Sequence, residues 1–143
     1  MAPVAPGTRA PDIPGTDLSE GLRAVFFYKV TCPTCQMAAP VAERLARSDG
    51  DRFTAVAQDP PEQIEVFARE YDTSFSSVPD QAPYALSDAY GIRTVPTVFA
   101  VQDGLVVDVV ESWDRDGWNR IGHALGAGDL SHEGDGLPPF RPG

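Results

Sequence analysis

The sequence predicts a single α/β domain in which a mixed β-sheet is covered by helices on both faces. A chain of 143 residues, 42 % of them apolar, suits one domain with a real core. Short β-rich runs alternate with helical patterns in the first half, and this alternation favours parallel strands. Nearer the C-terminus, Asp103-Gly104 joins two β-rich runs. This dipeptide is a strong hairpin signal and predicts an antiparallel pair.

The expected elements follow in the order β-α-β-α-β-α-β-β-α. Apolar or β-branched runs predict strands at 24–29, 53–57, 75–78, 97–101 and 105–110. Apolar residues at helical spacing predict a helix that follows the cysteines, includes Met37, Val41 and Leu45 and ends before Gly50, and further helices at 60–71, 84–90 and 115–125. Gly91 is expected to end the third helix, and Asp114 to cap the fourth. Four aromatic residues are expected to pack on helices rather than bind a cofactor: Phe67, Tyr71, Trp113 and Trp118.

The chain divides into three predicted segments. Residues 1–20 are rich in proline and glycine and are expected to form an extended lead-in. Residues 21–128 contain all of the predicted helices and strands and form the domain. Residues 129–143 are a C-terminal tail that is either disordered or laid across the domain.

Charge and hydropathy exclude several classes of function. The chain has 21 acidic and 11 basic side chains, a net charge of −10, so it repels phosphate backbones and no nucleic-acid partner is expected. No apolar stretch is long enough for a transmembrane span, and the N-terminus lacks the apolar core of a secretory signal. We therefore expect a cytoplasmic protein; an exported protein with its signal removed is the alternative. No nucleotide motif is present, and no cofactor is expected.

The chemistry is expected at Cys32 and Cys35, which form the one Cys-x-x-Cys pair of the chain. The pair lies where a predicted buried strand meets a predicted helix. Free N–H groups and the helix dipole at that point favour a thiolate, so Cys32 is the candidate nucleophile. Cys35, one turn later, is the candidate resolving thiol. Lys29 either favours the thiolate or is the solvated end of its strand.

Two other interpretations of the cysteine pair are a structural disulfide and half of a zinc site. Tetrahedral zinc needs four ligands, and beyond the pair the chain offers only His123 and His132. The spacing and context favour redox chemistry over both alternatives, and no metal is expected.

Two separated segments resemble the thioredoxin superfamily. Residues 26–40, with the cysteines and a proline five positions after the second, are similar to the thioredoxin active-site segment. Residues 90–97 are similar to the segment that carries its cis-proline. The resemblance covers roughly residues 20–126 and implies the thioredoxin fold. It also implies a cis Val95–Pro96 bond opposite Cys32, with the Val95 backbone pairing to an incoming substrate. The substrate-binding candidates are Val95, Pro96, Thr31, Pro33 and Thr34.

Within the superfamily the chain looks closest to the TlpA-like group. The lead-in of residues 7–18 is similar to that of the group, and residues 60–80 fit its helix-and-strand insertion before the cis-proline. Thioredoxins carry a buried aspartate on the strand before the cysteines, where this chain has Phe26. The group often places an acidic residue near the start of the inserted helix, and Asp59 falls there. Asp59 is therefore a candidate proton acceptor for Cys35, or simply the N-cap of that helix.

These features predict a thiol–disulfide oxidoreductase. Its partners would be protein or small-molecule disulfides and thiols, together with an upstream reductase or thiol pool. One alternative is a thioredoxin-fold binding module without turnover, which an insulin-reduction assay would distinguish. The other is a thiol peroxidase, which peroxide consumption would reveal; Thr31 precedes Cys32, but the proline expected just upstream in peroxidases is missing.

Overall fold

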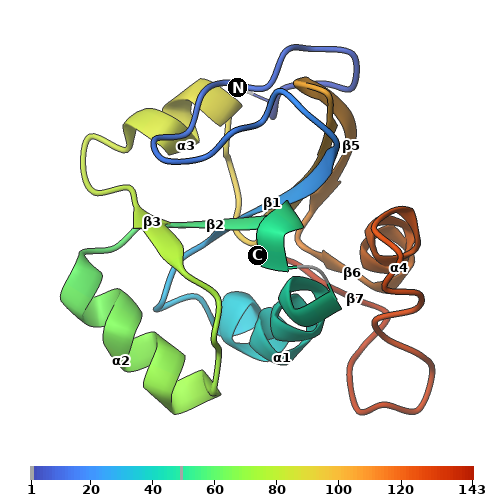
Figure 1. Cartoon of the computed structure of the whole chain (residues 1–143). Helices are drawn as coiled ribbons and strands as arrows, with labels where there is room; N and C mark the ends of the chain where they lie inside the picture. Colours follow the sequence, from blue (N-terminus) through green and yellow to red (C-terminus); the bar gives the residue numbers. More distant parts are fainter. Residues whose placement is uncertain (1, 49) are drawn as a thin grey trace.

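The central sheet has five strands in the order β3-β2-β1-β4-β5. The structure is a computed structural model that describes residues 2–48 and 50–143 (Figure 1). The strands are β1 (Leu22–Tyr28), β2 (Phe53–Ala57), β3 (Ser77–Pro79), β4 (Thr97–Gln102) and β5 (Leu105–Glu111). β1, β2 and β3 pair in parallel, whereas β4 pairs antiparallel with β1 and β5. The predicted mixed sheet and its hairpin are confirmed.

β1 lies at the middle of this sheet and is buried on both faces. Phe26 and Tyr28 point to one face, while Val25 and Phe27 point to the other, and each of these side chains is at most 1 % exposed. The alternation follows from the two-residue period of a strand. A nearly continuous apolar run is what a strand covered on both sides requires.

Helices cover both faces of the sheet, as predicted. They are α1 (Pro33–Ser48), α2 (Pro61–Tyr71), α3 (Ala85–Tyr90) and α4 (Arg115–Ala124), with a 3₁₀ turn at Gly50–Arg52. The face of Phe26 packs against α1, α2 and α4, and the face of Phe27 against α3 and the lead-in (Figure 1). Within the described residues, no helix has the length and apolar character to cross a membrane.

The helix ends follow the predicted caps with one exception. Gly91 adopts a left-handed φ of 70° after α3, and the Asp114 carboxylate accepts a hydrogen bond from the Gly117 N–H at 3.4 Å. The N-cap role predicted for Asp59 is wrong. Pro60 occupies the N-cap of α2, and its ring has no acceptor for a capping bond. The Asp59 carboxylate accepts from the Val30 N–H instead.

The lead-in runs along β5 and pairs with it. The Gly7 N–H donates to the Val106 carbonyl at 2.7 Å, and the Val106 N–H donates to the Thr8 carbonyl at 2.9 Å. Ile13 and Leu18 are buried against the sheet further along. The lead-in is therefore part of the packed structure although it contains no long strand or helix.

Residues 129–143 lie across the domain. Leu130 and Ser131 are buried beside α1 and α4. Two short strands, β6 (Trp113–Asp114) and β7 (Phe140–Arg141), pair antiparallel. This pairing returns the chain toward the start of α1 (Figure 1). Of the two arrangements predicted for the tail, disordered or laid across the domain, the structure shows the second.

Phe26 is the aromatic centre of the core and gives a test of the packing. Its ring stacks on Tyr28 at 5.1 Å between centroids and meets Trp118 edge-on at 5.6 Å. We expect Phe26→Ala to lower the free energy of unfolding by about 3–5 kcal/mol, because it leaves a cavity among rigid neighbours. Urea denaturation measures this loss. Val66→Ala, at a side chain 43 % exposed, is the control and should cost less than about 1 kcal/mol; equal losses would contradict the assigned core.

Candidate active site

Cys32 occupies the N-cap position of α1. Its carbonyl accepts the first helical hydrogen bond, from the Gln36 N–H at 3.0 Å, and Pro33 is the first residue of the helix. The Cys35 N–H donates to the Cys32 sulfur at 3.2 Å. The sulfur therefore takes the place of the oxygen that usually caps a helix, and it faces backbone groups without helical partners.

This position makes Cys32 acidic. Hydrogen bonding from Cys35 lowers the pKa of the Cys32 thiol to about 6, against the opposing effect of partial burial. The backbone N–H groups of Cys35 and Thr34 and the positive charge of Arg141 lower this pKa further. Near neutral pH the sulfur is accordingly a half-buried thiolate, which is the reactive form of cysteine.

Cys35 has the opposite character. Its side chain is fully buried, and this burial raises the pKa of the Cys35 thiol far above its ordinary value. The adjacent Cys32 and the Asp59 carboxylate act in the same direction. Both cysteines are free thiols in this structure. The pair thus combines one accessible acidic sulfur with one buried sulfur that holds its proton.

Asp59 lies beneath the loop that carries the cysteines. The side chain is 4 % exposed, and its carboxylate accepts a hydrogen bond from the Val30 N–H at 2.9 Å. Gln36 braces the same loop by donating to the Val30 carbonyl at 2.9 Å. Both polar backbone groups of Val30 are thereby satisfied, and this fixes the approach of the chain to Cys32.

The loop before β4 forms the other side of the site. The Val95–Pro96 peptide bond is cis. The Cys32 sulfur lies 3.5 Å from the Val95 carbonyl oxygen, to which it donates when it is protonated, so Val95 lies beside the sulfur. The Ser112 N–H donates to the Pro96 carbonyl at 2.8 Å and ties this loop to the end of β5.

The remaining predicted site residues differ in their exposure and in their contacts. Thr31 and Pro33 are exposed next to Cys32. Thr34 is 3 % exposed, and its hydroxyl donates to the Pro142 carbonyl at 2.6 Å. Lys29 donates to the Gln58 carbonyl at 3.4 Å, with its ammonium 5.8 Å from the centre of the Tyr84 ring.

Sequence reasoning missed the part of the site that comes from the tail. The cation whose charge lowers the Cys32 pKa is Arg141, and its guanidinium contacts the Met37 sulfur at 3.9 Å. Gly143 lies against Val95 and Thr94, where a Cβ atom would collide with the Val95 carbonyl oxygen. No local pattern in residues 129–143 signals these contacts, which depend on the long-range folding of the tail.

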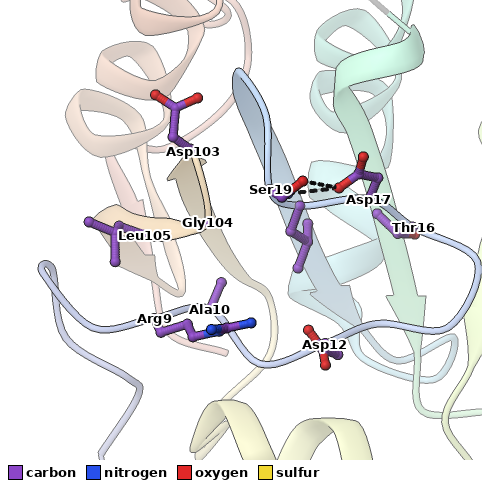
Figure 2. Close-up of a pocket in the computed structure, with 10 residues that line it drawn as sticks. Arg9, Ala10, Asp12, Thr16, Asp17, Ser19, Asp103, Gly104 and Leu105 are labelled. Atoms are coloured by element: carbon purple, nitrogen blue, oxygen red, sulfur yellow. Dashed lines mark hydrogen bonds between the residues drawn. The ribbon is translucent and has the colours of Figure 1, made fainter.

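A depression of about 340 Å³ lies away from the cysteines (Figure 2). Seven lead-in residues between Arg9 and Ser19 line it, together with Asp103, Gly104 and Leu105. The turn follows Gln102, which pairs with Leu22 at the opposite end of β1 from Cys32. Asp17 and Ser19 on its wall hydrogen-bond to each other. No group of three or more His, Cys, Asp or Glu side chains in the described ranges is arranged to hold a metal ion.

The chain is similar to several proteins of known structure. No protein-family model matches the chain. One similar structure is MTB DsbF, solved in its mixed oxidized and reduced forms. It shares 25 % sequence identity with this chain at a TM-score of 0.66, and the match covers 80 % of this chain and 84 % of DsbF. The thioredoxin domain of a Bacteroides vulgatus thiol-disulfide oxidoreductase shares 21 % sequence identity with this chain at a TM-score of 0.71. The match covers 85 % of this chain and 99 % of that domain.

A putative protein disulfide isomerase from Bacteroides thetaiotaomicron is 16 % identical with a TM-score of 0.75, over 92 % of this chain and 96 % of its own. The chain therefore has the thioredoxin fold, and its similarity to DsbF supports the thioredoxin superfamily predicted from the sequence.

The acidity of Cys32 predicts a defined pH dependence of its reactivity. Because its pKa lies at about 6, the rate of alkylation by iodoacetamide should rise with pH and reach half of its maximum near pH 6. Below that pH the sulfur is protonated and unreactive. The measurement is the alkylation rate of the reduced protein from about pH 4 to 9. Cys35→Ser, which keeps the backbone donor, should still react at one site, and a midpoint above pH 8 would contradict the assignment.

Proposed function

We propose that the chain is a thiol–disulfide oxidoreductase that works through the Cys32–Cys35 pair, of the kind found in the TlpA-like group. The observation that carries the proposal is the helix-capping position of the Cys32 sulfur, 3.2 Å from the Cys35 N–H. It supplies a nucleophilic thiolate and holds the second cysteine within reach of it. The similarity to DsbF and to other thiol-disulfide oxidoreductases supports the same activity.

The proposed cycle transfers two electrons to the substrate. The Cys32 thiolate attacks one sulfur of a substrate disulfide; a bond forms between Cys32 and the substrate, the substrate S–S bond breaks, and the leaving sulfur takes up a proton. Cys35 then loses its proton and attacks the Cys32 sulfur, and the second substrate thiol departs. The substrate is reduced, and the protein ends as the Cys32–Cys35 disulfide. An upstream reductase or thiol pool returns the two electrons.

The second step needs a proton acceptor, and Asp59 is our candidate. Burial and the nearby Asp59 charge both favour the protonated form of Cys35, so the thiol must be deprotonated as it attacks. The Asp59 carboxylate is buried and held in place by the Val30 N–H. It takes the role that a buried aspartate fills from the position of Phe26 in thioredoxins.

The direction of electron flow follows from the redox potential of the pair and from the compartment. In the cytoplasm, where we expect the chain to be, the pair would be kept reduced and would reduce its partners. In an oxidising compartment the same chemistry runs in reverse and introduces disulfides.

The redox equilibrium of the pair is the primary test. In glutathione buffers we expect a reversible two-electron transition between dithiol and disulfide, followed by alkylation and mass measurement. Cys35→Ser should abolish the transition, because the variant stops at the mixed disulfide with glutathione. A midpoint near about −270 mV would indicate a reductant, and one near about −120 mV an oxidant. If no intramolecular disulfide forms at any glutathione ratio, the proposed function is wrong.

Asp59→Asn tests the proton acceptor separately. Asparagine retains an oxygen for the Val30 N–H but accepts no proton, so turnover of insulin disulfides should fall by about tenfold or more. The pH profile of Cys32 alkylation should change little, because the first step does not use Asp59. Asp88→Asn, on the exposed side of α3, is the matched control. Unchanged turnover in Asp59→Asn would assign Asp59 a purely structural role.

A further inference from the structure

Residues 141–143, here called the strap, lie across the mouth of the dithiol site. The Pro142 carbonyl accepts the hydrogen bond of the buried Thr34 hydroxyl at 2.6 Å. The Gly143 N–H donates to the Ser112 hydroxyl at 3.2 Å. Two elements of the site, the first turn of α1 and the end of β5, therefore each hold one residue of the strap.

The strap shares one atom with the reactive cysteine. The Val95 carbonyl oxygen lies 3.5 Å from the Cys32 sulfur and also in contact with Gly143. The fit is close, because a Cβ atom at Gly143 would collide with this oxygen and with the Thr94 hydroxyl. The backbone at Val95, which is expected to pair with an extended substrate, already has a chain segment of this protein against it.

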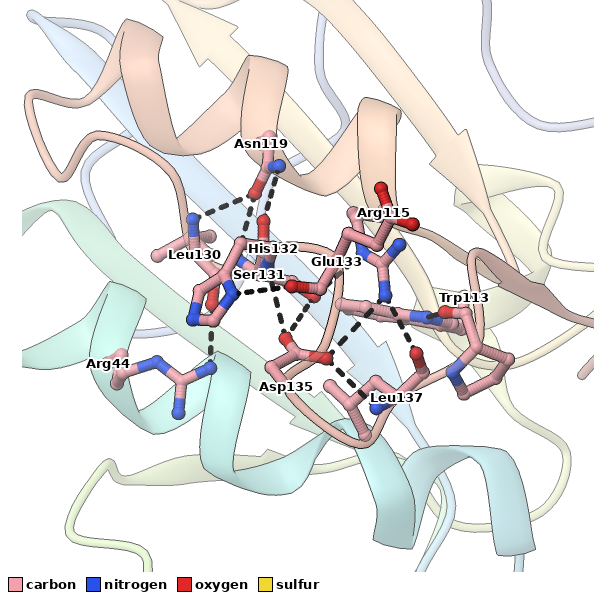
Figure 3. Close-up of polar contacts among 11 residues, drawn as sticks. Arg44, Trp113, Arg115, Asn119, Leu130, Ser131, His132, Glu133, Asp135 and Leu137 are labelled. Carbon is pink, nitrogen blue, oxygen red and sulfur yellow. Dashed lines mark hydrogen bonds and ion pairs between the residues drawn. The ribbon is translucent and has the colours of Figure 1, made fainter.

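The chain before the strap is firmly anchored. Arg115 donates to the Leu137 carbonyl at 2.7 Å, and the Trp113 indole to the Pro138 carbonyl at 2.7 Å (Figure 3). Asp135 accepts from the Leu137 N–H at 2.9 Å and pairs with Arg115 at 3.5 Å (Figure 3). The β6–β7 ladder includes Arg141, the first residue of the strap. The anchoring fixes where the strap begins, while residues 141–143 themselves remain exposed.

We propose that the strap is a size-selective gate on the dithiol, which an extended polypeptide must displace before it can pair at Val95 and which a small disulfide passes. The half-buried Cys32 sulfur remains accessible beside the strap to a small molecule. A polypeptide needs the backbone position that Gly143 occupies. The consequence for catalysis rests on the proposed function, because only an exchanger selects substrates in this way.

Arg141 belongs to the strap but also supports the thiolate form of Cys32. Its guanidinium lies near enough to Cys32 to stabilise the thiolate, and β7 pairing holds it independently of residues 142 and 143. Removing these two residues opens the Val95 backbone and keeps the Arg141 guanidinium, but it also moves a terminal carboxylate onto Arg141. Ser112→Gly changes no charge and is therefore the variant that separates access from acidity. Accessibility and acidity can accordingly be tested apart.

The experiment compares a small and a bulky thiol reagent on the reduced protein. Iodoacetamide reports the reactivity of Cys32, and a maleimide carried on polyethylene glycol reports its accessibility. A deletion of residues 142–143 removes both hydrogen bonds of the strap. In the full chain, Ser112→Gly removes one of them and suits the left-handed backbone at this position, where φ is 66°.

We expect the bulky reagent to react about fivefold faster with Ser112→Gly, the factor that corresponds to one hydrogen bond of about 1 kcal/mol, and faster still with the deletion. The iodoacetamide rate should change by less than about twofold in Ser112→Gly, because this variant changes no charge and the acidity of Cys32 is retained. Glu133→Ala, at an exposed tail position outside the strap, is the control and should match the wild type with both reagents.

Two results would overturn the gate. One is an unchanged rate with the bulky reagent in both variants, and the other is an equal change with both reagents in Ser112→Gly, which would indicate altered acidity rather than altered access. Alkylation does not depend on disulfide exchange, so failure of the gate is distinguishable from failure of the proposed function. A gate in the alkylation assay together with no reversible disulfide would retain the gate and reject the oxidoreductase.

Discussion

The pairing of β1 with strands on both sides is the constraint on which the rest of the structure depends. β2 fixes one edge of β1 and β4 the other, and both faces are buried, so its register cannot slip without moving every core side chain to the wrong face. The strand leads directly to Cys32 at the start of α1. Through the Phe27–Thr97 register, it also sets the position of Val95. One strand thereby places both sides of the dithiol site.

The elements with local signals could be predicted from the sequence. β1 and β2 are short apolar runs, and the Asp103–Gly104 turn adopts positive φ at both residues, as its dipeptide indicates. Asp114 caps α4 because an aspartate before a helix satisfies its first free N–H groups. The position of Cys32 at a helix start followed from the same kind of reasoning. In each case the decisive contacts lie within a few residues in sequence.

The contacts of Asp59 and of the tail could not be predicted from local sequence patterns. The sequence Asp-Pro-Pro-Glu is compatible with a cap, but the Val30 N–H, 29 residues earlier, provides a buried donor that the carboxylate satisfies instead. The tail is rich in proline and glycine, and its order comes from distant partners such as Trp113, Arg115 and Thr34. The charge of Arg141 acts on Cys32 only because those partners fold the tail back. Contacts between residues so far apart in the sequence produce no periodic pattern from which they could be predicted.

The pairing of the lead-in with β5 has a consequence for self-association. Exposed edge strands offer unpaired N–H and C=O groups on which other chains can assemble, and β5 carries exposed Leu105 and Val107 side chains. Gly7 and Thr8 hydrogen-bond to the carbonyl and the N–H of Val106, so these two groups of the β5 edge are not available to another chain. The lead-in thus covers the part of β5 where another chain could otherwise add a strand, and the molecule carries its own protection against edge-to-edge aggregation.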